Sequence, residues 1–334
     1  MRVALYHGAG RLTLVSRPDP APGPGELVVR VRACGICGSD LMTWYQDPRA
    51  PVVLGHEPAG EVVAAGEGAP FGPGERVFVH HHVPCMTCRL CRAGRHTLCE
   101  RFRETRIDPG GLAELVRVPA ENARLDVLAL PESVSEVAAT LIEPLGCVLR
   151  GLRLAGLERG MRVAVVGAGA MGLLYVEAAR ALGAGPVAAV EPREDRRALA
   201  LRSGAAPVAS ADPDAVRDAL GGRLADRVFV CTANRAAIAA SLHLAAPAAT
   251  VQLFAPTPPG ELVPLDLGAV FFREVSLQST YSAGPLDTRD ALDLIASGAV
   301  DAESLVSHRL PLAEVEEAFR LARSGEAVKV VVEP

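Results

Sequence analysis

One glycine motif constrains the fold of this chain more than any other feature. Gly167, Gly169 and Gly172 form G-x-G-x-x-G directly after the apolar segment MRVAVV and at the start of a segment with helical periodicity. In such a strand–turn–helix unit the first glycine permits the tight turn, the second lets backbone approach a pyrophosphate, and the third lets the helix pack closely. The helix N-terminus adds partial positive charge. The motif therefore predicts a dinucleotide site, with a glycine-rich turn that binds no ligand as the alternative.

The sequence on either side of this motif predicts two kinds of region. From about residue 148, strand-like segments alternate with helix patterns over 170–182 and 194–203, which predicts a parallel, doubly wound sheet. Residues 1–120 instead contain short strand-like segments between Gly and Pro turns, which predicts a β-rich, barrel-like region. The tail from about 283 carries two helix patterns and the strand-like KVVVE, and it need not belong to the second region. The predicted fold class is α/β.

Length and charge exclude several classes of protein. The chain has 334 residues, which corresponds to about two domains. Its hydrophobic fraction of 49% and net charge of −5 argue against a disordered chain and against binding through many phosphates, so we expect no nucleic-acid partner. No segment approaches ~18 consecutive apolar residues, and the first residues lack the pattern of a signal peptide. We therefore expect no membrane partner and a cytoplasmic location.

A carboxylate beyond the glycine motif bears on the choice of dinucleotide. Glu191 follows Gly172 by 19 residues, at the end of the second predicted strand. A carboxylate there can accept hydrogen bonds from the adenosine ribose hydroxyls and repel a 2′-phosphate, which favours NAD over NADP. Arg193, Arg196 and Arg197 follow it, and a guanidinium could hold that phosphate, so NADP stays open as the alternative.

Four cysteines lie close together in the sequence. They run C-x2-C-x2-C-x7-C and are Cys85, Cys88, Cys91 and Cys99. In a reducing compartment cysteines are thiols or metal ligands, so this spacing predicts a closed tetrahedral zinc site that braces a loop. An iron–sulfur cluster and unligated core cysteines are the alternatives.

Histidines and arginines accompany this loop. We interpret His80, His81, His82 and His96 as strand-end or surface residues, because four sulfurs already satisfy a metal. Arginines between residues 89 and 106 are interspersed with acidic residues, which predicts a solvated loop in preference to an anion site.

A second set of metal-ligand residues is scattered along the chain. Cys37 lies in GICGSD, His56 and Glu57 lie in GHE, and Glu143 lies in IEPLG. Each alone is unremarkable, since an isolated histidine is usually structural, and spacing by itself leaves both a metal site and ordinary structural roles open.

These motifs together resemble those of a known family. GICGSD, GHE with a following glycine, the four-cysteine loop, EPLG and GAGAMG resemble, in order and approximate spacing, the zinc-dependent medium-chain alcohol dehydrogenases. The glutamate in EPLG is similar to that of the sorbitol, other polyol and threonine dehydrogenase branch. This resemblance implies a GroES-like catalytic domain over 1–147, a Rossmann NAD-binding domain over 148–282, and a return of 283–334 to the catalytic domain. It also implies a homotetramer.

The resemblance assigns roles to particular residues. Cys37 and His56 would bind a catalytic zinc, with Glu57 or Glu143 as the carboxylate ligand. Asp40 would accept a hydrogen bond from the far nitrogen of His56, and Ser39 would begin the proton relay, although a turn aspartate and a turn serine are the ordinary alternatives.

Two further positions follow from the resemblance. Met42 stands five residues after Cys37, where many relatives have a histidine that passes the proton to solvent. Either the relay runs through ribose hydroxyls, water or Glu143, or the substrate differs from that of the relatives with histidine. Met171 and Arg196 match cofactor-contacting positions of threonine-dehydrogenase-like proteins.

The sequence thus predicts a zinc-dependent, NAD-linked dehydrogenase that oxidises a secondary alcohol or polyol by hydride transfer to the nicotinamide. A threonine- or diol-type dehydrogenase of the same family is the nearest alternative. A nicotinamide-binding sensor without catalysis is a second one, motivated by Met42. A zinc-stabilised nucleic-acid-binding module is a third, and the negative net charge disfavours it.

Overall fold

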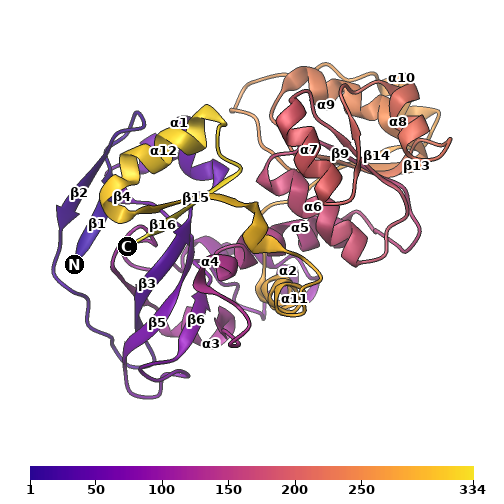
Figure 1. The fold of residues 1–334 in the computed structure, drawn as a ribbon. Helices are drawn as coiled ribbons and strands as arrows, with labels where there is room; N and C mark the ends of the chain where they lie inside the picture. Colours follow the sequence, from indigo (N-terminus) through magenta and orange to yellow (C-terminus); the bar gives the residue numbers. More distant parts are fainter. The chain divides into compact units, whose positions relative to one another are not determined.

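The computed structural model describes residues 1–334 and divides them into two compact units. The first unit consists of Met1–Gly146, Ala283–Ala296 and Ala302–Pro334, and the second consists of Cys147–Ser282 and Ser297–Asp301. The yellow C-terminal part of the ribbon therefore belongs to the same unit as the indigo N-terminal part (Figure 1).

Ten strands form the sheets of the first unit. They are β1 (Arg2–Tyr6), β2 (Leu12–Ser16), β3 (Leu27–Gly35), β4 (Val52–Val53), β5 (Glu57–Ala65), β6 (Arg76–Val79), β7 (Leu115–Val118), β8 (Val127–Ala129), β15 (Val306–Pro311) and β16 (Lys329–Glu333). One sheet has the order β2-β1-β4, and the other has the order β15-β16-β3-β5-β6-β8, with β7 also paired to β3. The prediction of a β-rich first region is confirmed.

The central strand of the larger sheet illustrates why these segments are strands. In β3, Val29, Val31 and Ala33 are buried, whereas Arg30 and Arg32 are exposed. This alternation with a period of two matches a sheet with one face on a hydrophobic core and one face toward solvent. Val29 and Val31 join a core with residues of β1, β5 and the C-terminal segment.

The helices of the first unit are mostly short. They are α1 (Thr43–Gln46), α2 (Arg89–Arg92), α3 (Ala120–Asp126), α4 (Glu136–Ala139), α11 (Pro285–Ala296) and α12 (Val315–Ser324), with 3-10 turns η1 (Gly38–Leu41), η2 (Asp47–Arg49), η3 (His96–Leu98), η4 (Glu100–Arg103), η6 (Ala302–Leu305) and η7 (Leu312–Glu314). A further helix, α5 (Ile142–Leu154), begins in the first unit and ends in the second.

The C-terminal strand β16 lies inside the larger sheet, between β15 and β3. β16 pairs antiparallel with β3, with Val331 opposite Gly35 and Val332 opposite Cys34. It also pairs parallel with β15, and α12 lies along it (Figure 1). Helix α12 ends at Gly325, whose φ of +76° is the left-handed conformation common after a helix C-terminus. This turn leads the chain into β16 and brings Lys329 to the end of β3.

The second unit is built around a six-stranded parallel sheet. Its strands are β9 (Val163–Val166), β10 (Val187–Val190), β11 (Ala206–Val208), β12 (Ala225–Val230), β13 (Ala245–Leu253) and β14 (Ser276–Ser279), and its helices are α6 (Ala170–Ala181), α7 (Glu194–Arg202), α8 (Pro213–Ala219), α9 (Arg235–Ser241) and α10 (Leu267–Phe271), with the turn η5 (Leu242–Leu244). The order β11-β10-β9-β12-β13-β14 corresponds to the doubly wound order 3-2-1-4-5-6. The predicted parallel sheet is confirmed.

Both faces of this sheet are covered. Every residue of β9 and β10 is buried, as expected for strands with helices on each side. Helices α8 and α9 share a hydrophobic cluster with Val228 and Val230 of β12, whereas Phe229, on the opposite face, stacks on Tyr175 of α6 with ring centroids 4.6 Å apart. The structure thus places α6 and its glycine turn against the middle of the sheet. None of the helices in the molecule has the length and hydrophobicity needed to cross a membrane.

Candidate active site

The candidate metal site begins at the end of β3. Cys37 precedes η1, and the backbone N–H of Cys37 donates to the Asp40 carboxylate at 3.0 Å. The backbone N–H of Asp40 donates in return to the Cys37 carbonyl at 3.0 Å. The buried Asp40 side chain therefore closes the turn that presents the Cys37 thiol.

Asp40 also orients a histidine from a different strand. His56 immediately precedes β5, and its Nδ1 lies 3.3 Å from Asp40 Oδ1. Burial by itself would lower the pKa of His56, but the Asp40 carboxylate and Cys37 raise it well above 6.5. Anionic groups that favour an imidazolium also favour a metal cation. The predicted contact between Asp40 and His56 lies within ion-pair distance.

Glu57 lies beside these two residues and is held by the only lysine of the chain. The Lys329 ammonium donates to Glu57 Oε2 at 2.5 Å and to the Ile36 carbonyl at 3.1 Å. Burial raises the pKa of Glu57, Lys329 and His56 lower it, and Glu143 raises it again, with a raised value as the net result. The other oxygen, Glu57 Oε1, is buried without a hydrogen-bond partner.

The position of the Glu57 carboxylate explains a glycine. A Cβ atom at Gly35 would lie 1.8 Å from Glu57 Oε2. No side chain fits there, so the end of β3 must be glycine for Glu57 and Lys329 to meet behind the metal-ligand atoms.

Cys37, His56 and Glu57 form one group whose sulfur, nitrogen and oxygen ligand atoms all lie within 4.8 Å of one another. A thiolate, an imidazole and a carboxylate suit a zinc ion that keeps a fourth position for water or substrate. The unpartnered Glu57 Oε1 is the buried atom that such an ion would satisfy. These residues therefore fit the zinc that the sequence predicts.

Glu143 lies in a neighbouring group. It is buried in the first turn of α5, and its carboxylate groups within 4.8 Å with ring nitrogens of His80 and His81. The two groups are close, because the rings of His56 and His81 have centroids 4.9 Å apart. The structure thus brings all four predicted zinc ligands into one region, with Glu57 beside Cys37 and His56, and Glu143 beside two histidines.

The interpretation of the histidines near the four-cysteine loop as strand-end or surface residues is wrong for His96, which lies in η3 and is 6% exposed. His80 does lie at a strand end, directly after β6, but it is 0% exposed. His81 and His82 are partly buried. A histidine run after an apolar strand cannot show from sequence whether it reaches solvent, since that depends on α3 and α5 packing over it.

The four cysteines of the loop form the other metal-type group. The sulfurs of Cys85, Cys88, Cys91 and Cys99 all lie within 4.8 Å of one another, with Cys85 and Cys91 Sγ atoms 3.9 Å apart. Zn–S bonds of about 2.3 Å in a tetrahedron require about that separation. Backbone N–H groups of Cys85, Cys88 and Cys91 each lie 3.4 Å from another cysteine's sulfur. The group therefore fits a closed zinc site.

These sulfurs differ in acidity without metal. Hydrogen bonds from the Thr87 side chain and backbone and from the Cys88 backbone lower the pKa of Cys85 to about 6. Burial and the neighbouring thiols raise the pKa of Cys91 to about 12.

The glycine turn has the geometry that the motif predicts. Gly167 has φ +96°, and a Cβ at Gly172 would lie 1.8 Å from the Gly167 carbonyl oxygen. At Gly169 the nearest atom to such a Cβ is 3.8 Å away, on Arg196, so the backbone there is open to a ligand. Helix α6, with Met171 in its first turn, starts directly after Gly169.

The acidic residue of the second unit faces this turn. Glu191 follows β10, and its carboxylate accepts hydrogen bonds from the backbone N–H groups of Ala168 at 2.9 Å and Arg193 at 3.0 Å. Arg193 forms an ion pair with Asp195 at 2.6 Å, and Arg197 donates to the Glu191 and Pro192 carbonyl groups. Arg193 and Arg197 are thus occupied by protein partners.

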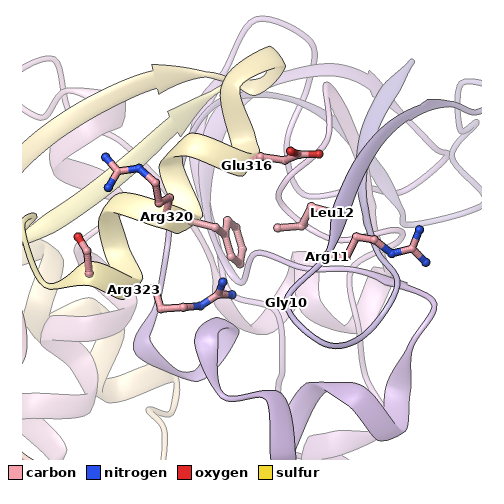
Figure 2. A pocket seen from close by; sticks show the side chains of 8 residues that line it. Gly10, Arg11, Leu12, Glu316, Arg320 and Arg323 are labelled. Carbon is pink, nitrogen blue, oxygen red and sulfur yellow. The ribbon is translucent and has the colours of Figure 1, made fainter.

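A surface cavity of about 430 Å³ lies elsewhere in the first unit, between β2 and α12. Its lining includes Leu12, Glu316 and the arginines Arg11, Arg320 and Arg323. In Figure 2 the Arg11 and Arg320 side chains point in opposite directions, and Arg320 is paired with Glu317 and Glu326. The charged groups do not converge on one ligand, and the cavity contains none of the predicted site residues.

Comparisons with known proteins agree with this geometry. Residues 23–132 match the alcohol dehydrogenase GroES-like domain, and residues 170–297 match the zinc-binding dehydrogenase family. The chain is 33% identical to sorbitol dehydrogenase from Gallus gallus, covering 98% of this chain and 95% of that protein. It is 32% identical to L-threonine 3-dehydrogenase from Bacillus licheniformis, covering 95% and 94%. A candidate zinc-binding dehydrogenase from Sinorhizobium meliloti 1021, bound to NADP, superposes with a TM-score of 0.87 at 33% identity, covering 100% and 99%.

Fold and site together define a zinc-dependent oxidoreductase with a nicotinamide cofactor. The chain belongs to the zinc-dependent medium-chain alcohol dehydrogenase family, in the branch of the sorbitol and threonine dehydrogenases. The resemblance seen in the sequence motifs is thereby confirmed.

Two residues of this region, Lys329 and Asp126, were not predicted from the sequence. Lys329 was the only lysine among 34 basic residues, in an otherwise apolar strand, and that isolation was a usable signal. Asp126, which bonds His80 at 2.6 Å, gave no signal, because an aspartate at the end of a short helix is commonplace.

Proposed function

We propose that this protein oxidises a secondary alcohol or polyol similar to sorbitol or L-iditol to the ketone, with NAD as the hydride acceptor. The observation that carries the proposal is the Cys37–His56–Glu57 group, in which Asp40 orients the histidine and one carboxylate oxygen has no protein partner. The sorbitol dehydrogenase similarity supports the substrate class.

In this proposal Cys37, His56 and Glu57 hold the catalytic zinc. Glu57 is favoured over Glu143 because Glu57 groups with the other two ligands and has a free Oε1. Zinc bound there would supply a Lewis acid that lowers the pKa of a substrate hydroxyl. Its charge would be balanced by one thiolate and one carboxylate, which suits a substrate with adjacent oxygens.

Ser39 is the proposed acceptor of the substrate proton. It is partly buried on η1, two residues after Cys37, and its backbone carbonyl is fixed by Gln46 at 3.0 Å. Met42 carries a thioether, which does not relay a proton. We therefore propose that the proton passes from Ser39 to water or Glu143, with Asp40 holding His56 throughout.

Residues of the second unit would bind the cofactor. Gly167, Gly169 and Gly172 shape the pyrophosphate turn, with Met171 and Arg196 beside it. We propose NAD because Glu191 stands where the ribose hydroxyls would lie, and because Arg193 and Arg197 are engaged by protein groups. The NADP-bound relative is the reason to test this choice directly.

We further propose that Cys85, Cys88, Cys91 and Cys99 hold a second, structural zinc, since four thiolates leave no position for substrate. Residues 1–147 and 283–334 would then carry the metal chemistry, and residues 148–282 the cofactor. The cytoplasmic location stays a prediction, consistent with eight cysteines that form no disulfide.

We also propose that the protein is a homo-oligomer. The family resemblance implies a tetramer. β14 is the edge strand of the parallel sheet, and Leu277 on it is 43% exposed. Leu267, Phe271 and Phe272 nearby are exposed by 70% or more. An edge strand with such side chains is usually covered by another chain, and light scattering after gel filtration would show the assembly.

The function is tested by NADH or NADPH formation, followed by absorbance, from zinc-loaded enzyme. Each cofactor is combined with sorbitol, xylitol, myo-inositol, threonine, butanediol and 2-propanol. We expect a vicinal polyol with NAD to give the highest kcat/KM. Threonine as the preferred substrate would favour the threonine branch, and silence with two or more zincs per chain would favour the sensor.

The cofactor choice has its own variant. Glu191→Ala removes the proposed ribose acceptor and should lower kcat/KM with NAD by about 10- to 100-fold, as expected for one or two lost hydrogen bonds. The value with NADP should change little. An equal loss with both cofactors would mean that Glu191 supports the turn through Ala168 instead.

A further inference from the structure

The side chain of Gln46 contacts the turn that carries Ser39. Gln46 is the last residue of α1 and is only 5% exposed. Its side-chain Nε2 donates to the Ser39 carbonyl at 3.0 Å. The Met42 N–H also donates to this carbonyl, but at 3.4 Å, which is long for an N–H···O hydrogen bond. The Gln46 amide therefore makes the shorter of the two bonds that hold this end of η1.

The peptide unit between Ser39 and Asp40 is held at both of its polar groups. Its N–H donates to the Cys37 carbonyl at 3.0 Å, and its carbonyl accepts from Gln46. The Ser39 hydroxyl is half-buried and bonds no other group of the protein, so it does not satisfy the backbone of its own turn. A fixed backbone with a free hydroxyl suits a serine that binds a ligand.

Gln46 itself lies on a fixed support. The next residue, Asp47, accepts hydrogen bonds from the Tyr6 hydroxyl and from the Ala9 backbone N–H. Tyr6 belongs to β1 and is 1% exposed. The end of α1 is thus tied to a strand outside the Ser39 turn, so Gln46 can hold Ser39 in place and does not simply move with it.

We infer that Gln46 is a positioning residue, which holds Ser39 where its hydroxyl can accept a hydrogen bond from the substrate alcohol. The inference rests on the role of Ser39 in the proposed function. A displacement of about 1 Å from the reacting geometry can lower a rate by about 100-fold, so a single bond to the Ser39 backbone has a measurable effect. Gln46 need not touch the substrate to produce it.

The inference is tested with Gln46→Met and Gln46→Glu, which remove the N–H donor and keep the length of the side chain. We expect each to lower kcat for polyol oxidation by about 10- to 100-fold with little change in KM. Gln252→Met is the matched control, because Gln252 makes the same type of buried bond, donating to the Gly151 carbonyl at 2.9 Å, but in the second unit. Each variant is measured alone and combined with Ser39→Ala.

The combined variants separate positioning from general support of the fold. If Gln46 acts through Ser39, Gln46→Met should slow the Ser39→Ala enzyme by less than about twofold, whereas any effect of Gln252→Met should be the same in both backgrounds. An equal fall in both backgrounds for Gln46→Met, or a Gln46→Met enzyme as fast as the wild type, would overturn the inference.

A crystallographic measurement does not depend on turnover. In zinc-loaded crystals of Gln46→Met we expect Ser39 to be displaced relative to Cys37, with the zinc content per chain unchanged from the wild type. An unmoved Ser39 would overturn the inference. A wild-type protein that oxidises no alcohol would contradict the proposed function instead, and the position of Ser39 would still show whether Gln46 holds it.

Discussion

The four-cysteine group takes its ligands from residues 85–99, whereas Cys37, His56 and Glu57 come from the ends of two strands and meet Lys329 from a third. The loop group is shaped by its own backbone, whose N–H groups donate to the sulfurs. The scattered group is shaped by the pairing of β3 with β5 and β16. A local site therefore depends on its loop, and a scattered site depends on the whole sheet.

The largest effect should follow from Cys37→Ala or His56→Ala. Loss of the metal would remove several kcal/mol of transition-state stabilisation, or about a thousandfold or more in kcat/KM. The circular dichroism spectrum and the zinc of the four-cysteine loop should be unchanged. If these variants lost as much stability as a variant of the four-cysteine loop, the two groups could not be divided into a catalytic and a structural site.

Cys88→Ser should act mainly on stability. Loss of the loop zinc removes binding energy that is available only to the folded state, and a loss of about 4 kcal/mol would lower Tm by about 8–16 °C. Calorimetry on zinc-loaded protein measures the shift. At a temperature where the variant is folded, its kcat should stay within a few-fold of the wild type, and a thousandfold fall there would contradict a structural role.

Lys329→Met tests the buried ion pair between Lys329 and Glu57, which has no counterpart in the four-cysteine loop. Removing the ammonium leaves Glu57 buried opposite an apolar side chain, which costs about 3 kcal/mol in the zinc-free protein. Bound zinc would compensate the carboxylate, so the fall in Tm should be smaller after zinc loading. Lys329→Arg, which keeps the charge, is the control. An equal fall in Tm with and without zinc would mean that Glu57 does not bind the metal.

The smallest effect concerns individual thiols of the loop. With zinc removed by a chelator, Cys85 should be alkylated faster than Cys91, because the pKa of Cys85 is about 6 and that of Cys91 about 12. The Cys85 rate should rise with pH through about 6 and then level off as the thiolate becomes complete. Peptide mapping after brief iodoacetamide treatment at pH 5, 6, 7 and 8 measures both. Equal rates would mean that the Thr87 hydrogen bonds do not control acidity.

Two kinds of feature could be predicted from the sequence: those that depend on residues close together in the chain, and those that occur as motifs of a known family. The glycine turn, helices over 170–182 and 194–203, and the four-cysteine cluster could be predicted because each depends on neighbours within about 20 residues. Cys37, His56 and Glu57 needed the family resemblance, since strand pairing brings them together.

Contacts made by single side chains across the fold could not be predicted. Lys329 reaches Glu57 over 272 residues, and Thr288 reaches Asp126 over 162 residues. Nothing in either segment encodes its partner. The burial of His80 likewise depends on helices that follow it in the chain, so a histidine run could be interpreted only by composition.

The pairing of β16 with β3 has a consequence for biosynthesis. All strands of the second unit's sheet lie before residue 280, so that sheet can form while the ribosome is still translating the tail. The sheet of the first unit cannot close until Lys329–Glu333 has left the exit tunnel, and Glu57 has no ammonium partner before then. The sheet of the second unit can therefore form before that of the first unit is complete, although the N-terminal strands of the first unit are synthesised earlier.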